Sequence, residues 1–325
     1  MKEIVIPKTE LKVSALCLGG GPHGVDPEES EKVLDYYLAS GGNFIDTANI
    51  YGQWKPGGGV SVSERFLGKY IKSRKCRNRI VLDTKGAAPH FDTMHVPRVS
   101  RKDILHDIDD SLKNLQVDYV DLYWLHHDDE KISVEEIIDT LVALVRGKIR
   151  YFGCSNWNTA RIREALDYSR KKKIPEFVGN QVMYNLAKYN QERLDQEIMF
   201  GMTSEMYALH KKEGLAVMCY SSQAQGYFSC ADKEDFMENP VYDNPREFYE
   251  NEISRLRLKK VKVLAKKYQC DPTQIALKYM LCKDAFPTIP IIGSGRLSEV
   301  KLSIEAMGIP LTKEECEYLE NDAKE

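Results

Sequence analysis

Short runs of apolar and β-branched residues alternate along the chain with longer stretches in which apolar residues recur every three or four positions. The first short run is residues 13–19, and the first longer stretch is residues 29–39. A short apolar run indicates a buried strand, whereas the wider spacing indicates a helix with one apolar face. The alternation therefore predicts repeated strand–helix units, from which parallel sheets are built.

The number of these units favours a closed barrel. Strands are expected at residues 13–19, 43–48, 80–85, 119–126, 150–155, 178–183, 216–220 and 288–292. Helices are expected at residues 29–39, 62–73, 101–115, 134–146, 160–172, 203–212, 252–268, 273–281 and 297–306. Eight units suit a parallel barrel, whereas a doubly wound sheet usually stops near about six strands. We therefore predict an α/β fold with one domain, a single (β/α)8 TIM barrel over residues 1–325.

The two ends of the chain and two long loops lie outside this repeat. Residues 1–12 alternate between apolar and polar around a turn at Pro7, which predicts a β-hairpin that plugs the barrel bottom. Residues 53–61 and 225–251 are expected to be loops on the catalytic face, where the loops after barrel strands gather. The tail at residues 312–325 begins with a capping signature, so we expect a helix packed outside the barrel.

Charge and cysteine content narrow the class of protein. The 46 Lys and Arg and 49 Asp and Glu residues give a formal net charge of −3, so no overall positive field attracts nucleic acid or anionic lipid. No apolar run reaches the ~18 residues of a membrane span, and the N-terminus lacks a secretory pattern. The eight cysteines form no C-x-x-C pair, which is typical of free thiols in a reducing compartment. We expect a cytoplasmic protein.

Four polar side chains at or just after strand ends form a chemically coherent set. Asp46, Lys85 and His126 lie in or at the end of three expected strands, and Tyr51 lies on a loop after Asp46. Taken singly, each is more often structural than catalytic. Together they suit the reduction of a carbonyl by a hydride donor, without a metal. The tyrosine can donate a proton to the carbonyl oxygen, the lysine can ease that proton's loss, the aspartate can keep the lysine charged, and the histidine can orient the oxygen.

The sequence around these residues resembles the aldo-keto reductase family. Residues 44–52, Phe-Ile-Asp-Thr-Ala-Asn-Ile-Tyr-Gly, are similar to the family's second-strand signature, and residues 84–85, 121–126 and 147–156 are similar to its next three. The resemblance covers essentially the whole chain. It implies an NAD(P)H-dependent oxidoreductase that reduces an aldehyde or ketone to an alcohol, with Tyr51 as the general acid. The catalytic residues that it implies are Asp46, Tyr51, Lys85 and His126.

The resemblance also implies which residues bind the nicotinamide coenzyme. Residues 220–226 are similar to the loop that wraps the diphosphate, and residues 291–299 to the segment that reads an adenosine 2′-phosphate at a helix N-terminus. Ser155, Asn156 and Gln181 are expected to contact the carboxamide, and Tyr220 to stack on the ring. The other residues expected to bind the coenzyme are Gly21, Asp46, Ser221, Ser222, Gln223, Gly226, Ile292, Gly293, Ser294, Arg296, Glu299 and Ser303.

The choice between NADPH and NADH depends on a few residues near the C-terminus. Arg296 favours NADPH, which is the coenzyme that we expect. Glu299 stands where relatives often carry a cation or an amide, and Ser303 stands where asparagine is common. NADH therefore stays open as the alternative.

The substrate is expected to meet side chains on the loops after the first, second, fourth and fifth strands. These residues are His23, Trp54, His127 and Trp157. Aromatic side chains stack on sugar rings and also suit apolar aldehydes. The loop at residues 54–59 and the segment at residues 220–226 resemble those of bacterial members linked to carbohydrate metabolism. We therefore expect an oxidised sugar or another sugar-derived carbonyl as the substrate.

Three alternatives were weighed against this interpretation. Residues 19–24 match G-x-G-x-x-G, but the unit count argues against a Rossmann fold. Residues 126–129, His-His-Asp-Asp, could ligate metal in a sugar isomerase, but adjacent strand residues point to opposite faces, so His126 and His127 should not share an ion. The same fold could also serve as a nicotinamide-binding regulatory or channel-accessory subunit, although the complete set of four polar residues argues for catalysis. The sequence leaves the oligomeric state open.

Overall fold

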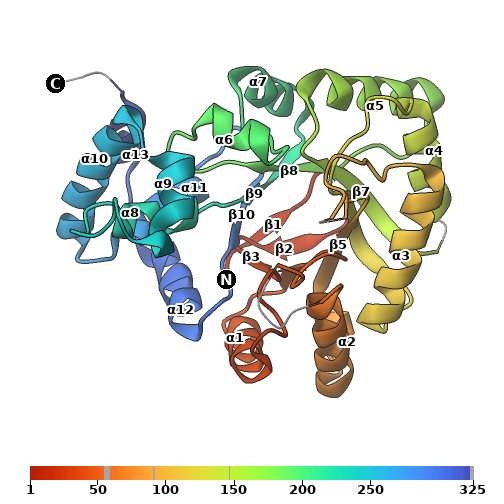
Figure 1. Ribbon diagram of the computed structural model, residues 1–325, viewed down its shortest axis with the longest axis horizontal. Helices are drawn as coiled ribbons and strands as arrows, with labels where there is room; N and C mark the ends of the chain where they lie inside the picture. Colours follow the sequence, from red (N-terminus) through yellow and green to blue (C-terminus); the bar gives the residue numbers. More distant parts are fainter. Residues whose placement is uncertain (55–58, 91, 146, 323–325) are drawn as a thin grey trace.

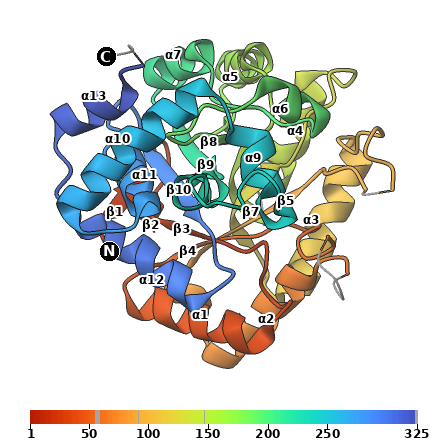
Figure 2. The same cartoon turned by 60° about the vertical axis from the view of Figure 1, so that its left-hand side comes forward.

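The computed structural model, which describes residues 1–54, 59–90, 92–145 and 147–322, is a closed barrel of eight parallel strands inside a ring of helices (Figures 1 and 2). The barrel confirms the predicted fold. Its strands are β3 (Cys17–Gly19), β4 (Phe44–Asp46), β5 (Val81–Gly86), β6 (Val120–Leu125), β7 (Ile149–Ser155), β8 (Gly179–Met183), β9 (Ala216–Tyr220) and β10 (Thr288–Ile292). They pair in chain order, and β10 pairs with β3 to close the barrel.

Alternation along the strands divides the core in two. In β4, Phe44 belongs to the cluster inside the barrel, whereas Ile45 packs into the larger cluster beneath the helices. Val81 and Leu82 of β5 divide in the same way. Because side chains alternate between the two faces of a strand, both faces of every barrel strand must be apolar, which explains the nearly continuous apolar runs.

The N-terminal hairpin closes the bottom of the barrel, as predicted. Its strands are β1 (Glu3–Val5) and β2 (Lys12–Ser14), which pair antiparallel. Ile6, Leu11 and Val13 are buried in the interior cluster with residues from the beginnings of the barrel strands. The single strand expected at residues 13–19 is wrong, because β2 belongs to the hairpin and only β3 belongs to the barrel.

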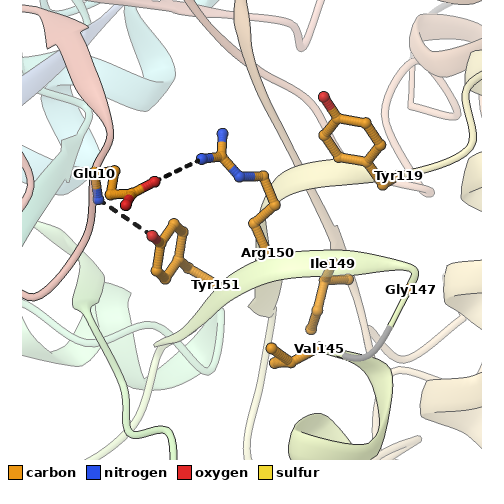
Figure 3. Close-up of a pocket in the computed structure, with 7 residues that line it drawn as sticks. All are labelled: Glu10, Tyr119, Val145, Gly147, Ile149, Arg150 and Tyr151. Atoms are coloured by element: carbon orange, nitrogen blue, oxygen red, sulfur yellow. Dashed lines mark hydrogen bonds and ion pairs between the residues drawn. The ribbon is translucent and has the colours of Figure 1, made fainter.

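Polar contacts fasten the hairpin turn to the start of β7. The backbone N–H of Glu10 donates to the Tyr151 hydroxyl at 3.2 Å, and the Glu10 carboxylate lies 3.9 Å from the Arg150 guanidinium (Figure 3). Arg150 also pairs with buried Asp121 of β6 at 2.9 Å. These contacts line a shallow hollow at the end of the barrel away from the predicted catalytic residues.

The helices follow the strands along the chain, and their bounds agree closely with the predicted ranges. They are α1 (Pro27–Ala39), α2 (Val62–Arg74), α3 (Arg101–Leu115), α4 (Val134–Leu144), α5 (Thr159–Lys172), α7 (Ser204–Glu213), α10 (Glu252–Tyr268), α11 (Pro272–Leu281) and α12 (Leu297–Glu305). Polar side chains cap the N-termini of most of these helices, as Ser100 does for α3 and Asp271 does for α11. Helix α2 is an exception, because Ser61 at its N-cap makes no capping hydrogen bond through its side chain. The predicted tail helix is α13 (Lys313–Glu320), which contacts α10 outside the barrel.

The predicted loop at residues 225–251 contains helices that the sequence analysis missed. These are α8 (Tyr227–Cys230) and α9 (Asp243–Tyr249), and a further short helix, α6 (Gln191–Gln196), follows β8. Single-turn 3-10 helices occur at Arg77–Arg79, Ala224–Gly226, Pro240–Tyr242 and Ala306–Gly308. Residues 55–58 of the other predicted loop lie outside the described residues. Among the helices described, none is both long and apolar enough to span a bilayer.

Candidate active site

The structure brings the four predicted catalytic residues together at the carboxyl ends of the barrel strands. Lys85 Nζ donates to Asp46 Oδ1 at 2.6 Å and to the backbone carbonyl of Thr47 at 2.8 Å. The same Nζ lies 4.6 Å from the centre of the Tyr51 ring, and the Tyr51 and His126 rings are 6.0 Å apart. Asp46 and Lys85 are each 1% exposed, so this is a buried ion pair beside a tyrosine and a histidine.

Strand periodicity explains why these side chains converge. Phe44 faces the barrel interior, so Asp46, two positions later, faces the same side. Val81 likewise sets the inward direction of Asp83 and Lys85 in the neighbouring strand β5. Tyr51 and His126 lie just beyond the ends of β4 and β6, where the loops turn over the barrel mouth.

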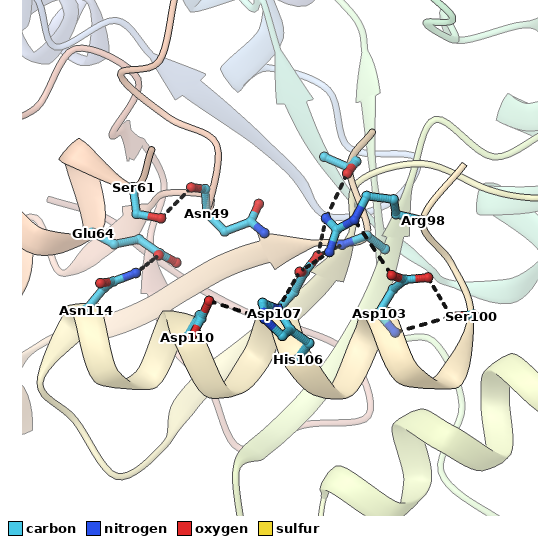
Figure 4. A network of polar contacts seen from close by, with 12 residues as sticks. Asn49, Ser61, Glu64, Arg98, Ser100, Asp103, His106, Asp107, Asp110 and Asn114 are labelled. Carbon is cyan, nitrogen blue, oxygen red and sulfur yellow. Dashed lines mark hydrogen bonds and ion pairs between the residues drawn. The ribbon is translucent and has the colours of Figure 1, made fainter. Parts of the chain in front are cut away.

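Helix α2 holds the outer side of β5 in place. Thr84, between Asp83 and Lys85, points outward and donates to Glu64 Oε1 at 2.7 Å. Glu64 is completely buried and also accepts from Asn114 Nδ2 of α3 at 3.3 Å (Figure 4). Burial raises the pKa of Glu64, and its hydrogen bonds oppose that rise. The carboxyl group therefore ties β5 to two helices on the side opposite Lys85.

A second group of contacts fixes the chain immediately after Lys85. Asp107 of α3 accepts from the backbone N–H of Ala87 at 2.9 Å and pairs with Arg98 at 2.6 Å (Figure 4). Arg98 also donates to the carbonyl of Ala88 at 3.1 Å. On the other side of the site, the Ser61 hydroxyl donates to the carbonyl of Asn49 at 2.6 Å. These contacts hold the backbone on both sides of the site, which keeps its side chains in a fixed geometry.

Burial and charge set the protonation states of the site. Burial alone would lower the pKa of Lys85, but the nearby charges, chiefly Asp46, raise it above its usual value, so the ammonium is retained. Burial raises the pKa of Tyr51 to about 12, against the lowering effect of Lys85. Burial, His127 and Lys85 together hold the pKa of His126 well below its usual range, so its imidazole is neutral.

Two opposing effects set the protonation state of Tyr51. Lys85 lowers the pKa of Tyr51, as expected, but the desolvation of the partly buried phenol outweighs that effect. Tyr51 is therefore a neutral phenol that keeps its proton at physiological pH. This state suits a proton donor.

Sequence reasoning missed Asp83, a third acidic group inside the barrel. Asp83 pairs in register with Asp46 and is completely buried, and its carboxyl oxygens have no hydrogen-bond partner among the described residues. Burial and the Asp46 charge raise the pKa of Asp83 well above its usual value. Lys85 therefore pairs directly with Asp46, while burial and the Asp46 charge disfavour the ionisation of Asp83. The inward alternation of residues 81, 83 and 85 was the available signal.

A groove of about 650 Å³ begins at Asp46 and Tyr51 and runs across the barrel mouth to α11 and α12. That volume is in the range of ligand pockets. Its lining residues are Gly19, Gly21, Pro22, Asp46, Tyr51, Trp54, Tyr220, Ser221, Ser222, Gln223, Gln225, Gly226, Ser229, Asp271, Thr273, Gln274, Ile291, Ile292, Gly293, Glu299 and Leu302. About half of these residues were predicted from the sequence to belong to the site.

The backbone of this groove fits a dinucleotide. Ala224, Gln225 and Gly226 have positive φ angles of 49°, 52° and 82° in succession, the type of backbone from which anion-binding turns are built. Glycine at 226 tolerates this conformation without strain. At Gly293 a Cβ atom would meet no described atom within 4 Å, so the groove is open there. The backbone at Gln225, Gly226 and Gly293 is therefore where the groove could hold a diphosphate.

Several residues predicted to bind the coenzyme stand behind the groove instead of lining it. Gln181 Nε2 donates to Asp46 Oδ1 at 2.7 Å, and the Tyr220 hydroxyl donates to Asn156 Oδ1 at 2.9 Å. Tyr220 itself lines the groove, as expected for a ring that stacks on a nicotinamide. The predicted residues outside the lining are Ser155, Asn156, Gln181, Ser294, Arg296 and Ser303. In this structure Gln181 holds Asp46 in position, and Asn156 holds Tyr220 in position.

Of the four residues predicted to meet the substrate, two lie at the site. The Trp54 ring meets the Tyr51 ring edge-on at 5.3 Å and is 46% exposed. His127 stacks on His126 with ring centres 5.4 Å apart. The expectation that His126 and His127 point to opposite faces is wrong, because β6 ends at Leu125 and strand alternation no longer applies beyond it.

The other two predicted substrate residues are buried. Trp157 is 0% exposed, packs against Phe177 with ring centres 5.2 Å apart, and donates through Nε1 to the carbonyl of His127 at 3.3 Å. His23 is also 0% exposed and lies beside Phe66. The structure therefore does not support direct contact of either residue with a substrate. The two residues were assigned to the substrate pocket only because they lie on loops after strands. A large side chain in such a loop can also turn back into the core.

Comparison with known proteins agrees with this architecture. The Aldo/keto reductase family model matches residues 15–323. The chain is 29% identical to norsolorinic acid reductase B of Dothistroma septosporum, over 97% of this chain and 79% of that protein. It is 30% identical to the uncharacterized oxidoreductase YrpG of Bacillus subtilis, over 97% and 93%. The crystal structure of the thermostable aldo-keto reductase Tm1743 with the inhibitor epalrestat has the same fold, with a TM-score of 0.72, 24% identity and 99% and 100% coverage.

These matches extend over nearly the whole barrel, the predicted catalytic residues included. The family supports an oxidoreductase that uses a nicotinamide coenzyme. The chain belongs to the aldo/keto reductase family.

Proposed function

We propose that this protein reduces an aldehyde or ketone to the alcohol, with a reduced nicotinamide coenzyme as the hydride donor and Tyr51 as the proton donor. The observation that carries the proposal is the buried Lys85–Asp46 ion pair, 2.6 Å long, beside a neutral tyrosine at one end of a dinucleotide-sized groove. A purely structural ion pair would not need Tyr51 beside the ammonium and His126 beside Tyr51.

When bound, the coenzyme supplies the hydride. The side chains of the protein donate the proton and orient the carbonyl oxygen. The Tyr51 phenol donates its proton to the carbonyl oxygen as negative charge develops there. Lys85, held as an ammonium by Asp46, stabilises the phenolate that remains. The neutral imidazole of His126 donates a hydrogen bond that orients the carbonyl oxygen.

The substrate side of the site favours a molecule with a flat or ring-shaped face. Trp54 offers an exposed aromatic ring next to Tyr51, and His127 adds a neutral imidazole whose pKa burial lowers to about 4. Such a surface stacks on a sugar ring or on an aryl ring. The sequence favours an oxidised sugar, whereas the name of the norsolorinic acid reductase relative supports norsolorinic acid as a further test compound.

The proposal is tested by following the absorbance of NADH and NADPH with a panel of carbonyls. The panel contains a reactive dicarbonyl, several oxidised sugars and several aryl aldehydes and ketones. We expect oxidation of a reduced coenzyme by at least one class. Tight coenzyme binding with no turnover on any of them would instead favour the regulatory-subunit alternative.

The pH dependence of the reaction follows from the protonation states. Reduction requires Tyr51 in its protonated form, so activity is lost only as pH rises toward its pKa of about 12. His126 is already neutral, because its pKa lies well below the usual range. We therefore expect kcat/KM for carbonyl reduction to stay constant within ~3-fold from about pH 6 to about pH 9. An ionisation of the free enzyme near neutral pH would contradict these assignments.

A further inference from the structure

We infer that this chain selects NADH over NADPH, and that Glu299 is the residue that determines the choice. This inference rests on the proposed function, because it concerns the coenzyme of the same site. It reverses the preference that the sequence favours, and it follows from the carboxylates at the far end of the groove.

The groove has two chemically different ends. At one end lie Tyr51 and Asp46, where the carbonyl would be reduced. At the other end lie the first residues of α11 and the side of α12 that carries Glu299 and Leu302. A dinucleotide with its nicotinamide beside Tyr51 must therefore place its adenosine half against α11 and α12.

The adenosine end of the groove is acidic. Asp271 and Glu299 both line it, and no lysine or arginine is among the described lining residues. Glu299 lies in the first turn of α12, with its Oε2 only 3.5 Å from where a Cβ atom on Gly295 would stand. The carboxylate thus folds back over the start of the helix, where the helix dipole stabilises negative charge.

A second carboxylate already occupies the N-terminus of α12. Glu29 of α1 accepts a hydrogen bond from the backbone N–H of Leu297 at 2.7 Å. Free N–H groups at a helix N-terminus would otherwise bind a phosphate. With Glu29 on that amide and Glu299 in the first turn, a phosphate placed here would meet two negative charges.

The basic side chains near this helix do not line the groove. Lys32 lies 3.7 Å from Glu29, and Lys301 lies over the Tyr36 ring of α1 at 5.4 Å. Arg296 is exposed and lies outside the lining. Among the described residues, therefore, no lysine or arginine side chain lines the groove beside α12.

The two coenzymes differ only at the adenosine ribose. NADH carries a 2′-hydroxyl, which can donate a hydrogen bond to a carboxylate, whereas NADPH carries a phosphate there. A carboxylate at this place favours the hydroxyl through a charge-assisted hydrogen bond and repels the phosphate. Glu299 is placed to make this distinction.

Dissociation constants of NADH and NADPH, measured by calorimetry at one ionic strength, test the inference without relying on turnover. The full-length wild-type chain is expected to bind NADH at least ~10-fold more tightly than NADPH. Glu299→Gln removes the charge and keeps the shape, and should lower the ratio of the NADPH to the NADH constant by at least ~5-fold. Glu305→Gln removes a charge from the same helix outside the groove lining and should leave the ratio unchanged.

The possible results separate this inference from the proposed function. Wild-type binding of NADPH as tight as that of NADH would overturn the inference and leave the proposed reductase intact. An unchanged ratio in Glu299→Gln would also overturn it, because the preference would then arise elsewhere. Failure of both coenzymes to bind would overturn the proposed function itself.

Discussion

Replacing Tyr51 with phenylalanine is expected to lower kcat for carbonyl reduction by at least ~10²-fold, the usual contribution of a positioned proton donor. The reason is that the phenol keeps its proton at neutral pH, with a pKa of about 12, so it can donate that proton to the carbonyl oxygen. Coenzyme oxidation by the purified variant, compared with the wild type on the same carbonyl, gives the result.

Coenzyme binding by the Tyr51→Phe variant serves as the control for an intact site. The ring remains, so its contact with Trp54 and its place beneath Lys85 are kept and the fold should not change. The dissociation constant of the coenzyme should therefore stay within ~2-fold of the wild-type value. Near-normal turnover would show that Tyr51 is not the acid.

Replacing Lys85 with methionine is expected to lower both activity and stability. Removing one partner of a buried ion pair leaves the other uncompensated, which costs about 3–5 kcal/mol of unfolding free energy. Asp46 is 1% exposed and accepts its shortest hydrogen bonds from Lys85 and Gln181. Turnover should fall by at least ~10²-fold, because the phenolate of Tyr51 loses its nearest cation. Denaturant unfolding and coenzyme oxidation measure the two effects.

A double variant separates stability from catalysis. Adding Asp46→Asn to Lys85→Met removes the unpaired carboxylate and keeps an acceptor for Gln181, so about 2 kcal/mol of stability should return. Turnover should not recover, because the cation is still missing. Recovery of activity with stability would mean that the ion pair only supports the fold.

The sequence predicted the barrel well because its strands are apolar on both faces and its helices carry clear capping residues. Asp46, Lys85 and His126 could be placed at one pocket because strand ends in a parallel barrel converge. The division of residues 13–19 between two sheets could not be predicted, since both parts are equally apolar. The short helices α8 and α9 were missed because they are one or two turns long and depend on tertiary contacts.

The finer features of the site depended on packing that no local pattern reveals. Trp157 and His23 turn into the core, although their loops lie at the barrel mouth. Glu29 reaches α12 from a helix 268 residues earlier in the sequence, so its occupation of the α12 N-terminus is visible only in the fold. The raised pKa of Tyr51 depends on how far its surroundings desolvate the phenol, which the spacing of residues in the sequence does not show.

The central claim, direct hydride transfer to a carbonyl at Tyr51, is tested most directly with a reduced coenzyme that carries deuterium on the transferable position of the nicotinamide. The alcohol formed from a carbonyl that the enzyme accepts is then analysed by mass spectrometry. We expect one deuterium on the carbinol carbon of the product formed by the wild type. We expect almost no labelled alcohol from Tyr51→Phe. An alcohol without the label, or labelled product formed equally well by the variant, would contradict the claim.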